Sequence, residues 1–403
     1  MGERGADGVG PFEDVDPFED VDLQRLRRRR TVKWSLYGPE VLAAWVAEMD
    51  FDVAAPVRAA LLEAVAREDF GYVEADLSPL TTACAALQQD LHGWDVSPAR
   101  IVPVADVLAG IVAALDMCTP PGAPVVVPTP AYPPFFEVVE LSGRPVVPVP
   151  MQVRDGRWVL DTEGIDAALS VGARAVLLCN PHNPTGRVFA PEELDGLAAV
   201  VTAHGARVVA DEVHAPLVLP GARHVPYASR DEATASHTTT VTSASKAWNL
   251  AGLKCAQVVL SNHDDAARWR RLPVFAVPGP TPLGVAASVA AYRDGDPWRR
   301  GLVVHLDRQR TLLTELLERH LPGARWIPSE ATFLAWIDCT GLGLDDPAAH
   351  FLHRGRVAVS DGPPFGAGAE QFVRLNIGTS SELLERIVAA LGAALRDGAP
   401  RSG

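Results

Sequence analysis

The sequence predicts an α/β fold with two domains: a large one with a mostly parallel sheet covered by helices on both faces, and a smaller α+β one. Short apolar runs that alternate with helical or Gly/Pro-rich stretches predict the large sheet. After Pro297 a long helical segment and further strands predict the second unit, and 403 residues suffice for two cores. We divide the chain into an acidic tail expected to be disordered (1–24), a segment joining the small domain (25–50), a large domain (51–296) and a small C-terminal domain (297–403).

The elements of the large domain follow from local patterns. Apolar residues at helical spacing predict helices at residues 56–68 and 79–92, with a turn containing Tyr72 between them. A further helix, 191–204, begins with Pro and ends before Gly205. Strands are expected at residues 124–127, 174–179, 207–210, 238–242 and 255–260.

The predicted elements of the small domain do not alternate as those of the large domain do. A long helix at residues 298–320 comes first, and a last helix ends near residue 396. Thr379 and Glu382 form the pattern of a capping box at the start of that last helix. Between the two helices, strands are expected at residues 332–337, 357–359 and 372–377.

Composition narrows the classes of partner. A formal net charge of −14 would repel phosphates at long range, so neither nucleic acid nor a membrane is expected as a partner. The sequence has no apolar signal-peptide core and no run of about 18 apolar residues that could span a membrane. The five cysteines are far apart and lack metal-ligand spacing, so we expect no metal site, and buried thiols in a reducing cytoplasm. They are Cys84, Cys118, Cys179, Cys255 and Cys339.

The tail contains a repeated hexapeptide. PFEDVD occurs twice in succession, at residues 11–16 and 17–22. Acidic, low-complexity sequence of this kind rarely orders itself, so the tail is expected to lack fixed structure. The arginine-rich run at residues 25–30 is interpreted as a solvated or internally paired face, because acidic residues precede it.

Polar residues follow three consecutive strands of the predicted sheet. The three segments are NPHNPTG at 180–186, DEVH at 211–214 and SASK at 243–246. In open α/β sheets, ligands bind outside the carboxyl ends of the strands, so these segments predict one site. Lys246 lies at the mouth of the sheet, where desolvation would make its amine nucleophilic toward a carbonyl.

Four motifs in this order resemble the pyridoxal-phosphate (PLP) enzymes of the class I/II aminotransferase superfamily, which have fold type I. They are CNPHNPTG at 179–186, DEVH at 211–214, SASKAWNLAGLK at 243–254 and FVRLNIGT at 372–379. More narrowly, the DEVH motif and three further stretches look like the branch containing cystathionine β-lyases of the MalY/PatB type. These stretches are VKWSLY at 32–37, WVAEMDF at 45–51 and FGY at 70–72.

The resemblance implies a role for each residue around the PLP ring. Lys246 would form the Schiff base with PLP and then act as the base that takes the substrate Cα proton. Asp211 would face the protonated ring nitrogen, because PLP withdraws electrons only in that state. Asn183, followed by a cis Pro184, would hold the phenolic oxygen. Tyr132 would stack on the ring, although a role in core packing is nearly as well supported.

The resemblance also implies a phosphate site and a dimer. Ser243 and Lys254 would bind the phosphate, helped by backbone N–H groups of a helix that starts near Val107. Tyr72 matches a residue that reaches the phosphate of the neighbouring subunit in relatives. A homodimer with active sites shared between subunits is therefore expected.

Arg374 matches the arginine that grips the α-carboxylate of a small amino-acid substrate, a contact suited to its planar fork. His214 is expected near a cofactor oxygen, and a buried structural role fits it equally well. Trp45 and Asp50 are expected to shape the entrance without a catalytic role.

Two positions depart from the pattern of the MalY-like branch. The stretch VADVLAG places Asp106 at the start of the phosphate helix, where a carboxylate would repel a phosphate. Either the alignment is displaced by one residue there or the site is remodelled. Pro216 stands where relatives often have an acidic residue. Both changes bear on substrate and reaction specificity more than on cofactor binding.

The MalY-like motifs favour β-elimination, so the function implied is a C–S β-lyase. Such an enzyme cleaves a cysteine S-conjugate or a cystathionine-like substrate to a thiol, pyruvate and ammonia. An aminotransferase is the second hypothesis, and a decarboxylating or oxidative PLP enzyme is the third. A catalytically idle regulatory homologue is the non-enzymatic alternative; it predicts a missing lysine or aspartate, whereas Lys246 and Asp211 are both present.

Overall fold

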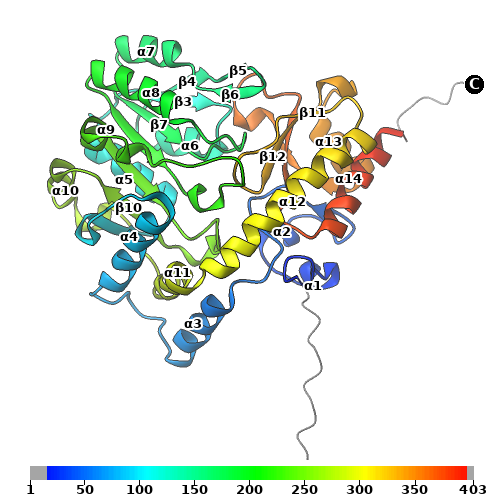
Figure 1. The fold of residues 1–403 in the computed structure, drawn as a ribbon, viewed down its shortest axis with the longest axis horizontal. Helices are drawn as coiled ribbons and strands as arrows, with labels where there is room; N and C mark the ends of the chain where they lie inside the picture. The colour runs from blue at the N-terminus through cyan, green and yellow to red at the C-terminus, as the bar shows by residue number, and fades with distance from the viewer. Residues whose placement is uncertain (1–15, 397–403) are drawn as a thin grey trace, which may run out of the picture.

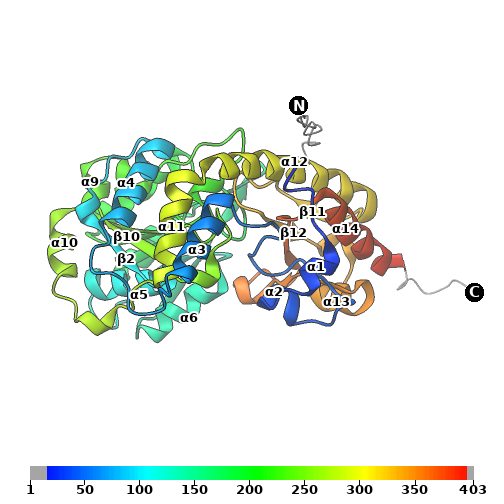
Figure 2. The same cartoon turned by 90° about the horizontal axis from the view of Figure 1, so that it is seen from below.

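The computed structural model describes residues 16–396, apart from the side chain of Val274. Two sheets form the centres of two units that lie side by side (Figures 1 and 2). Helix α12 (Asp296–His320) runs from the large unit along the small one in both views. The first PFEDVD copy, apart from its last residue, lies outside the described residues.

The large unit contains a seven-stranded sheet in the order β2-β10-β9-β8-β7-β3-β4. The strands from β9 to β4 are parallel to their neighbours, while β10 is antiparallel to both β9 and β2. The sheet is therefore mostly parallel, as the sequence predicts. The strands are β2 (Ile101–Val104), β3 (Val125–Thr129), β4 (Val146–Pro150), β7 (Ala175–Cys179), β8 (Arg207–Asp211), β9 (Thr238–Thr242) and β10 (Ala256–Leu260).

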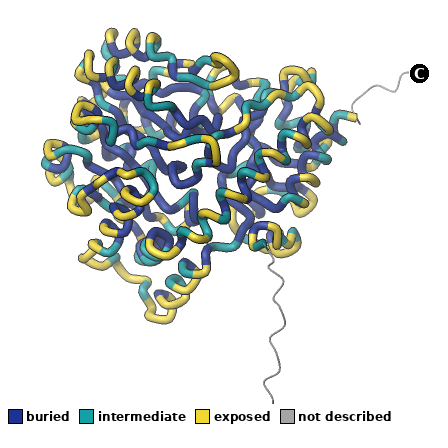
Figure 3. The backbone as a smooth tube through the Cα atoms, viewed as in Figure 1, coloured by how far each residue is buried: buried dark blue, intermediate teal, exposed yellow. Residues whose placement is uncertain are grey.

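Helices bury both faces of this sheet, which explains why its strands read as continuous apolar runs. Successive residues of β3 point to opposite faces. Val125 and Val127 pack with α5 (Val107–Cys118) and α6 (Pro133–Leu141), and Val126 packs with α7 (Thr162–Ser170) and α8 (Pro191–Ala203). The sheet is buried while the outer sides of the helices are exposed (Figure 3). The helices of the large unit are α3 (Ala55–Ala66), α4 (Ser78–His92), α5 (Val107–Cys118), α6 (Pro133–Leu141), α7 (Thr162–Ser170), α8 (Pro191–Ala203), α9 (Glu232–His237), α10 (His263–Trp269) and α11 (Pro282–Asp294).

The small unit is an α+β arrangement around a four-stranded sheet, β11-β12-β15-β14. Its strands are antiparallel to their neighbours. Helix α14 (Ser381–Arg396) packs against α12. The pair β5 (Gln152–Arg154) and β6 (Arg157–Val159) forms a separate hairpin. The elements of the small unit are β11 (Arg325–Trp326), β12 (Leu334–Asp338), α13 (Pro347–Gly355), β13 (Val357–Ala358), β14 (Ser360–Asp361), β15 (Phe372–Asn376) and α14 (Ser381–Arg396).

The N-terminal segment is attached to the small unit. It contains α1 (Leu23–Arg27) and α2 (Val32–Ser35), and β1 (Leu42–Ala43) pairs in parallel with β13. A buried ion pair joins Lys33 Nζ to Asp50 Oδ1 at 2.8 Å, and Trp34 Nε1 donates to the same oxygen at 2.9 Å. Asp50 is therefore a buried structural residue, and our expectation that it shapes the entrance is wrong.

The second PFEDVD copy has a fixed place, contrary to our expectation of disorder through residue 24. Phe18 is buried against Phe51 and Trp298, with ring centroids 5.1 and 5.4 Å away. Glu19 accepts hydrogen bonds from the backbone N–H and the hydroxyl of Ser381, at the N-terminus of α14. A buried aromatic side chain and a carboxylate at a helix N-terminus both hold this segment against the rest of the chain.

Two further details differ from the sequence prediction. The sequence did not indicate the edge strands β2 and β4, because Pro103, Pro148 and Pro150 interrupt their apolar pattern and proline is tolerated at sheet edges. The capping box is absent: Ser380, not Thr379, accepts from the Leu383 N–H at 3.3 Å. Within residues 16–396, no helix is long and apolar enough to cross a lipid bilayer.

Candidate active site

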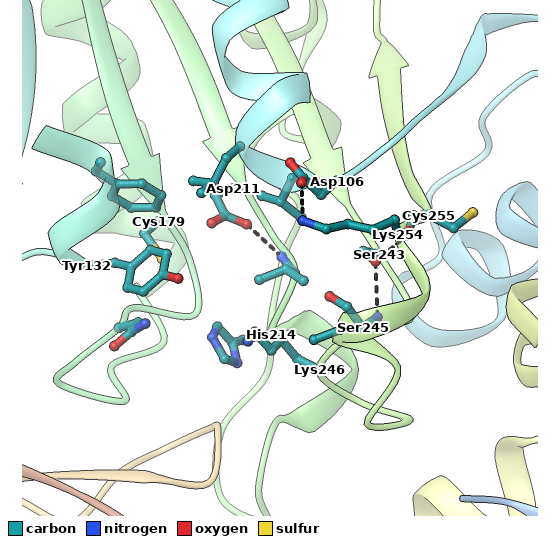
Figure 4. Close-up of a pocket in the computed structure, with 16 residues that line it drawn as sticks. Asp106, Tyr132, Cys179, Asp211, His214, Ser243, Ser245, Lys246, Lys254 and Cys255 are labelled. Atoms are coloured by element: carbon teal, nitrogen blue, oxygen red, sulfur yellow. Dashed lines mark hydrogen bonds and ion pairs between the residues drawn. The ribbon is translucent and has the colours of Figure 1, made fainter. Parts of the chain in front are cut away.

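The carboxyl ends of β7, β8 and β9 lie next to one another, as the three polar motifs predict. They border a cavity of about 160 Å³ (Figure 4). The N-terminus of α5 also borders the cavity. Gly110 lets this helix approach the sheet closely, because a Cβ at this position would lie 2.9 Å from the Val241 side chain. Seven of the predicted site residues line it: Tyr132, Asn183, Asp211, His214, Ser243, Lys246 and Lys254.

Lys246 reaches the cavity from the turn after β9. Its Nζ donates a hydrogen bond to the carbonyl of Ala47 at 3.2 Å. Burial, together with the positive charge of Arg374, lowers the pKa of Lys246 to about 8, while Asp211 opposes the shift. A substantial fraction of the amine is therefore neutral near pH 8, the state needed for attack on a carbonyl.

Asp211 ends β8 and is buried. Its Oδ1 accepts the N–H of Val213 at 3.1 Å, and burial raises the pKa of the carboxyl to about 7. No salt bridge to Asp211 occurs within residues 16–396. A buried carboxylate without a cation partner favours a ligand that brings a positive charge, such as a protonated ring nitrogen.

Arg374, from β15 of the small unit, meets the large unit at Asn183. Its Nη1 donates to Asn183 Oδ1 at 3.0 Å, and its Nη2 donates to the Trp45 carbonyl at 3.2 Å and to Ser360 Oγ at 3.1 Å. Burial lowers the pKa of the guanidinium to about 10, and its Nε has no hydrogen-bond partner in the described part of the chain. Arg374 is thus a buried cation with an unused donor.

A second cavity, of about 490 Å³, lies beside the first and contains Arg374 in its wall. Tyr132 lines both cavities, and Trp45 lines the second, while its role at an entrance stays a prediction. The Tyr132 ring packs edge-to-face against Phe135 at 5.5 Å. The two cavities are therefore adjoining spaces, one at the sheet edge and one between the two units.

His214 and Asn183 are buried beside Lys246. Burial lowers the pKa of His214 to about 3, so the imidazole is neutral, and its Nδ1 has no hydrogen-bond partner within residues 16–396. The peptide bond between Asn183 and Pro184 is cis, as expected.

The two side chains expected to bind a phosphate within their own chain, Ser243 and Lys254, are bonded to other groups of the chain. Ser243 Oγ donates to the Cys255 carbonyl at 2.7 Å and accepts from the Ser245 N–H at 3.0 Å. Lys254, in a left-handed conformation (φ +54°), pairs with Asp106 Oδ2 at 2.7 Å. Asp106 is the N-cap of α5, and its Oδ1 accepts from the Ala109 N–H at 2.9 Å. The Asp106 carboxylate, which departs from the pattern of the MalY-like branch, is therefore part of the cavity wall and is held there by these two bonds.

Several groups at the site could not be found from the motifs. The carbonyls of Trp45 and Ala47 accept from Arg374 and Lys246, and Asn249 holds both the N–H and the carbonyl of Met49. The segment at residues 45–51 thus contributes backbone atoms to the site, and backbone atoms cannot be recognised from the type of side chain. Ser360 is a single serine in a β-strand, and nothing in its local sequence marks it.

Tyr72 is the one cofactor-binding candidate that does not line the cavity of its own chain. It lies in the turn between α3 and α4 and is fully exposed. Its expected contact with a neighbouring subunit stays a prediction. In the part of the chain that the structure describes, no cluster of His, Cys, Asp or Glu could hold a metal ion.

Comparisons with known proteins agree with this arrangement. The model of the family "aminotransferase class I and II" matches residues 46–391. A putative cystathionine beta-lyase of Mycobacterium tuberculosis is 40% identical over 399 residues, covering 93% of this chain and 97% of the relative. The cystathionine beta-lyase PatB of Bacillus subtilis is 33% identical over 375 residues, covering 90% and 97%.

The fold is shared with solved structures. A putative PLP-dependent beta-cystathionase of Corynebacterium diphtheriae superposes with a TM-score of 0.89 at 40% identity, covering 93% of this chain and 98% of that chain. The sequence match and the structural match both span the two units. The chain therefore belongs to the class I and II aminotransferase family.

Proposed function

We propose that this protein is a PLP-dependent C–S β-lyase. It would cleave a cysteine S-conjugate or a cystathionine-like substrate by α,β-elimination and, with one water, yield a thiol, pyruvate and ammonia. The observation that carries the proposal is the Lys246 amine, with its pKa lowered to about 8, in one cavity with the buried Asp211 carboxylate. The relatives named as cystathionine beta-lyases support the choice of reaction.

The residues of the cavity fit PLP. Lys246 supplies an amine for covalent attachment, Asp211 a buried negative charge for a ring N–H⁺, and Lys254 with Ser243 polar groups at the other end. The Nδ1 atom of His214, which has no partner in the described part of the chain, offers a further hydrogen-bonding atom. When bound, PLP withdraws electrons from the bonds of the substrate α-carbon and makes its proton acidic.

The chain's own residues then bind, orient and move a proton. Arg374 binds the substrate α-carboxylate with its planar guanidinium, whose Nε has no hydrogen-bond partner among residues 16–396. Lys246 Nζ, neutral in part near pH 8, takes the proton from the α-carbon and is then an ammonium that can return it to the departing sulfur. The carbonyl of Ala47 orients that ammonium through its hydrogen bond.

Labelling tests the attachment of PLP sharply, because the chain contains only three lysines, Lys33, Lys246 and Lys254. Purified protein with PLP should be yellow, lose that colour on borohydride reduction, and carry the label on Lys246. Lys33 is buried against Asp50 and serves as an internal control. A colourless protein, or a label on another amine, contradicts the assignment.

The reaction itself is tested by omitting a keto acid. A cysteine S-conjugate should give pyruvate and free thiol in equal amounts without an acceptor, and K246A should abolish both. Product that appears only when a keto acid is added would instead identify an aminotransferase. Intact PLP binding without turnover of amino acids would favour an idle homologue.

We further propose a homodimer in which the partner subunit's Tyr72 reaches the cavity. Full exposure of this tyrosine in a single chain supports the proposal. Mixing K246A subunits with Y72A subunits tests it, because a hybrid dimer would contain one site with both lesions and one intact site. Activity should exceed that of either parent; no gain would mean that Tyr72 acts within its own chain or not at all.

We propose a cytoplasmic enzyme, supported by the cysteines, all of which are free thiols within residues 16–396. Burial raises the pKa of Cys84 to about 12, so this thiol is unreactive.

A further inference from the structure

The ion pair between Asp106 and Lys254 is a feature of the cavity that the proposed reaction does not use. Asp106 Oδ2 lies 2.7 Å from Lys254 Nζ, and both side chains line the cavity beside Ser243 (Figure 4). These residues are 148 positions apart in the chain, and α5 and the turn before β10 bring them together. The pair is partly exposed, with about half of the Lys254 side chain accessible.

The carboxylate of Asp106 already occupies the groups that attract an anion at this end of the cavity. The N-terminus of α5 carries a partial positive charge and free N–H groups, which favour a negative ligand. Asp106 Oδ1 takes the Ala109 N–H there, and its Oδ2 takes the ammonium of Lys254. The Ser243 hydroxyl donates to the Cys255 carbonyl instead of pointing to a free ligand.

A phosphate at this end of the cavity therefore meets two obstacles. It must share or displace the Asp106 carboxylate from Lys254, and it comes close to a second negative charge. Burial disfavours the charged form of Asp106, but the hydrogen bonds from Lys254 and Ala109 outweigh it and hold its pKa below the ordinary value. The carboxylate is thus ionised at neutral pH, and both obstacles are present.

We propose that Asp106 is an internal anion that competes with the cofactor phosphate for Lys254 and the N-terminus of α5, and so weakens the binding of PLP. We take PLP as the ligand, so this inference rests on the proposed function. In the cofactor-free protein the carboxylate satisfies the cation and the helix N-terminus. On binding, the phosphate replaces it in part.

Asp106→Asn tests the proposal, because asparagine keeps the N-cap acceptor and removes the charge. The dissociation constant of PLP, measured by absorbance on cofactor-free protein, should fall on the order of tenfold. Pyridoxal, which lacks the phosphate, should bind equally well to both proteins. Inorganic phosphate should raise the Tm of cofactor-free D106N more than that of the wild type.

Asp161→Asn is the matched control. Asp161 is the N-cap of α7 and accepts from the Gly164 N–H, but it does not line the cavity. This variant removes the same charge from the same kind of position and should leave PLP affinity unchanged. If D106N fails to fold, Asp106→Ser gives an uncharged N-cap of another size.

Lys254→Met in both backgrounds gives an independent readout. In the wild type Asp106 already neutralises Lys254, so K254M should weaken PLP binding only slightly. In D106N the freed ammonium faces the phosphate, and the same substitution should cost about tenfold more. Equal costs in the two backgrounds would contradict competition.

The results of these experiments distinguish a failure of the inference about Asp106 from a failure of the proposed function. Weaker PLP binding by D106N would mean that Asp106 positions Lys254 for the phosphate, and it overturns the inference. Equal tightening for PLP and pyridoxal overturns it as well, because the effect would not involve the phosphate. If none of the variants nor the wild type binds PLP, the proposed function fails, and the inorganic phosphate measurement still decides whether Asp106 competes with anions.

Discussion

Arg374 Nη1 donates a hydrogen bond to Asn183 Oδ1 at 3.0 Å, although the two residues are 191 positions apart. Arg374 belongs to β15 of the small sheet, and Asn183 follows β7 of the large sheet. This contact stands between the two cavities and joins the two units at the point where the substrate carboxylate is expected. It fixes the guanidinium while leaving its Nε without a partner in the described residues.

Replacing Arg374 should impair substrate binding. Arg374→Gln removes a charge-assisted contact, and kcat/KM should fall about 100-fold, mostly through KM. Arg374→Lys should recover little, because an ammonium cannot form the two-pronged contact. Arg157→Gln, an exposed arginine paired with Glu330, is the control and should stay within about twofold. A fall in kcat at unchanged KM would place Arg374 elsewhere in the mechanism.

The reactivity of Lys246 should depend on pH in a defined way. Cofactor-free enzyme should attach PLP at a rate that rises with pH through about 8, since the neutral amine reacts and burial has lowered its pKa. Arg374→Gln removes a positive charge that contributes to this lowering, so the midpoint should move to higher pH. Stopped-flow absorbance measures both midpoints. A wild-type midpoint near that of an ordinary lysine would show that the amine is not desolvated.

Asp211→Asn should stabilise the cofactor-free protein at neutral and alkaline pH. Burial raises the Asp211 pKa to about 7, so the folded state binds the proton more tightly than the unfolded state. The resulting stability is present at acidic pH and is lost as the pH rises from about 4 to 7, by up to ~4 kcal/mol. The free energy of unfolding, measured with urea from pH 5 to 8, should show this loss in the wild type and not in D211N. The D211N variant should also fail to support catalysis. Parallel pH profiles would contradict the raised pKa.

The ion pair between Lys33 and Asp50 should show strong coupling. Each partner is buried, so Lys33→Met or Asp50→Asn alone should lower the free energy of unfolding by about 3–5 kcal/mol. The double variant leaves no unpaired charge and should cost clearly less than the sum. The exposed pair of Arg67 and Glu63 is the control, with E63Q within about 1 kcal/mol. Additive costs would mean that the two charges act independently.

Phe18 should anchor the second hexapeptide copy. Phe18→Ala removes a buried ring from its contacts with Phe51 and Trp298 and should lower the free energy of unfolding by about 3 kcal/mol. Val171→Ala, at an exposed position, should change it by less than about 0.5 kcal/mol. Chemical denaturation measures both. An unchanged F18A protein would show that the segment adds nothing to stability.

The amino-acid pattern predicts the fold class, and the resemblance of the motifs to PLP enzymes predicts the cofactor. Apolar runs buried on both faces identify parallel strands, and the polar motifs after β7, β8 and β9 name one sheet edge, because parallel neighbours end on the same side. These local patterns locate Lys246 and Asp211 at that edge, and the resemblance to PLP enzymes implies their roles. Each depends only on its own strand and the turn that follows.

Contacts between distant positions of the chain are visible in the structure alone. The pairing of Asp106 with Lys254, the contact of Arg374 with Asn183 and the Ala47 carbonyl at Lys246 join positions more than a hundred residues apart. Local periodicity predicts which side of an element is buried, but it does not predict which distant residues contact that side. Every residue has a backbone carbonyl, so the sequence does not distinguish the carbonyls that bind a side chain. The burial of Phe18 could not be predicted for the same reason. Its acidic neighbours predict a solvent-exposed segment, whereas the residues that bury its ring belong to α12 and to the segment around Phe51.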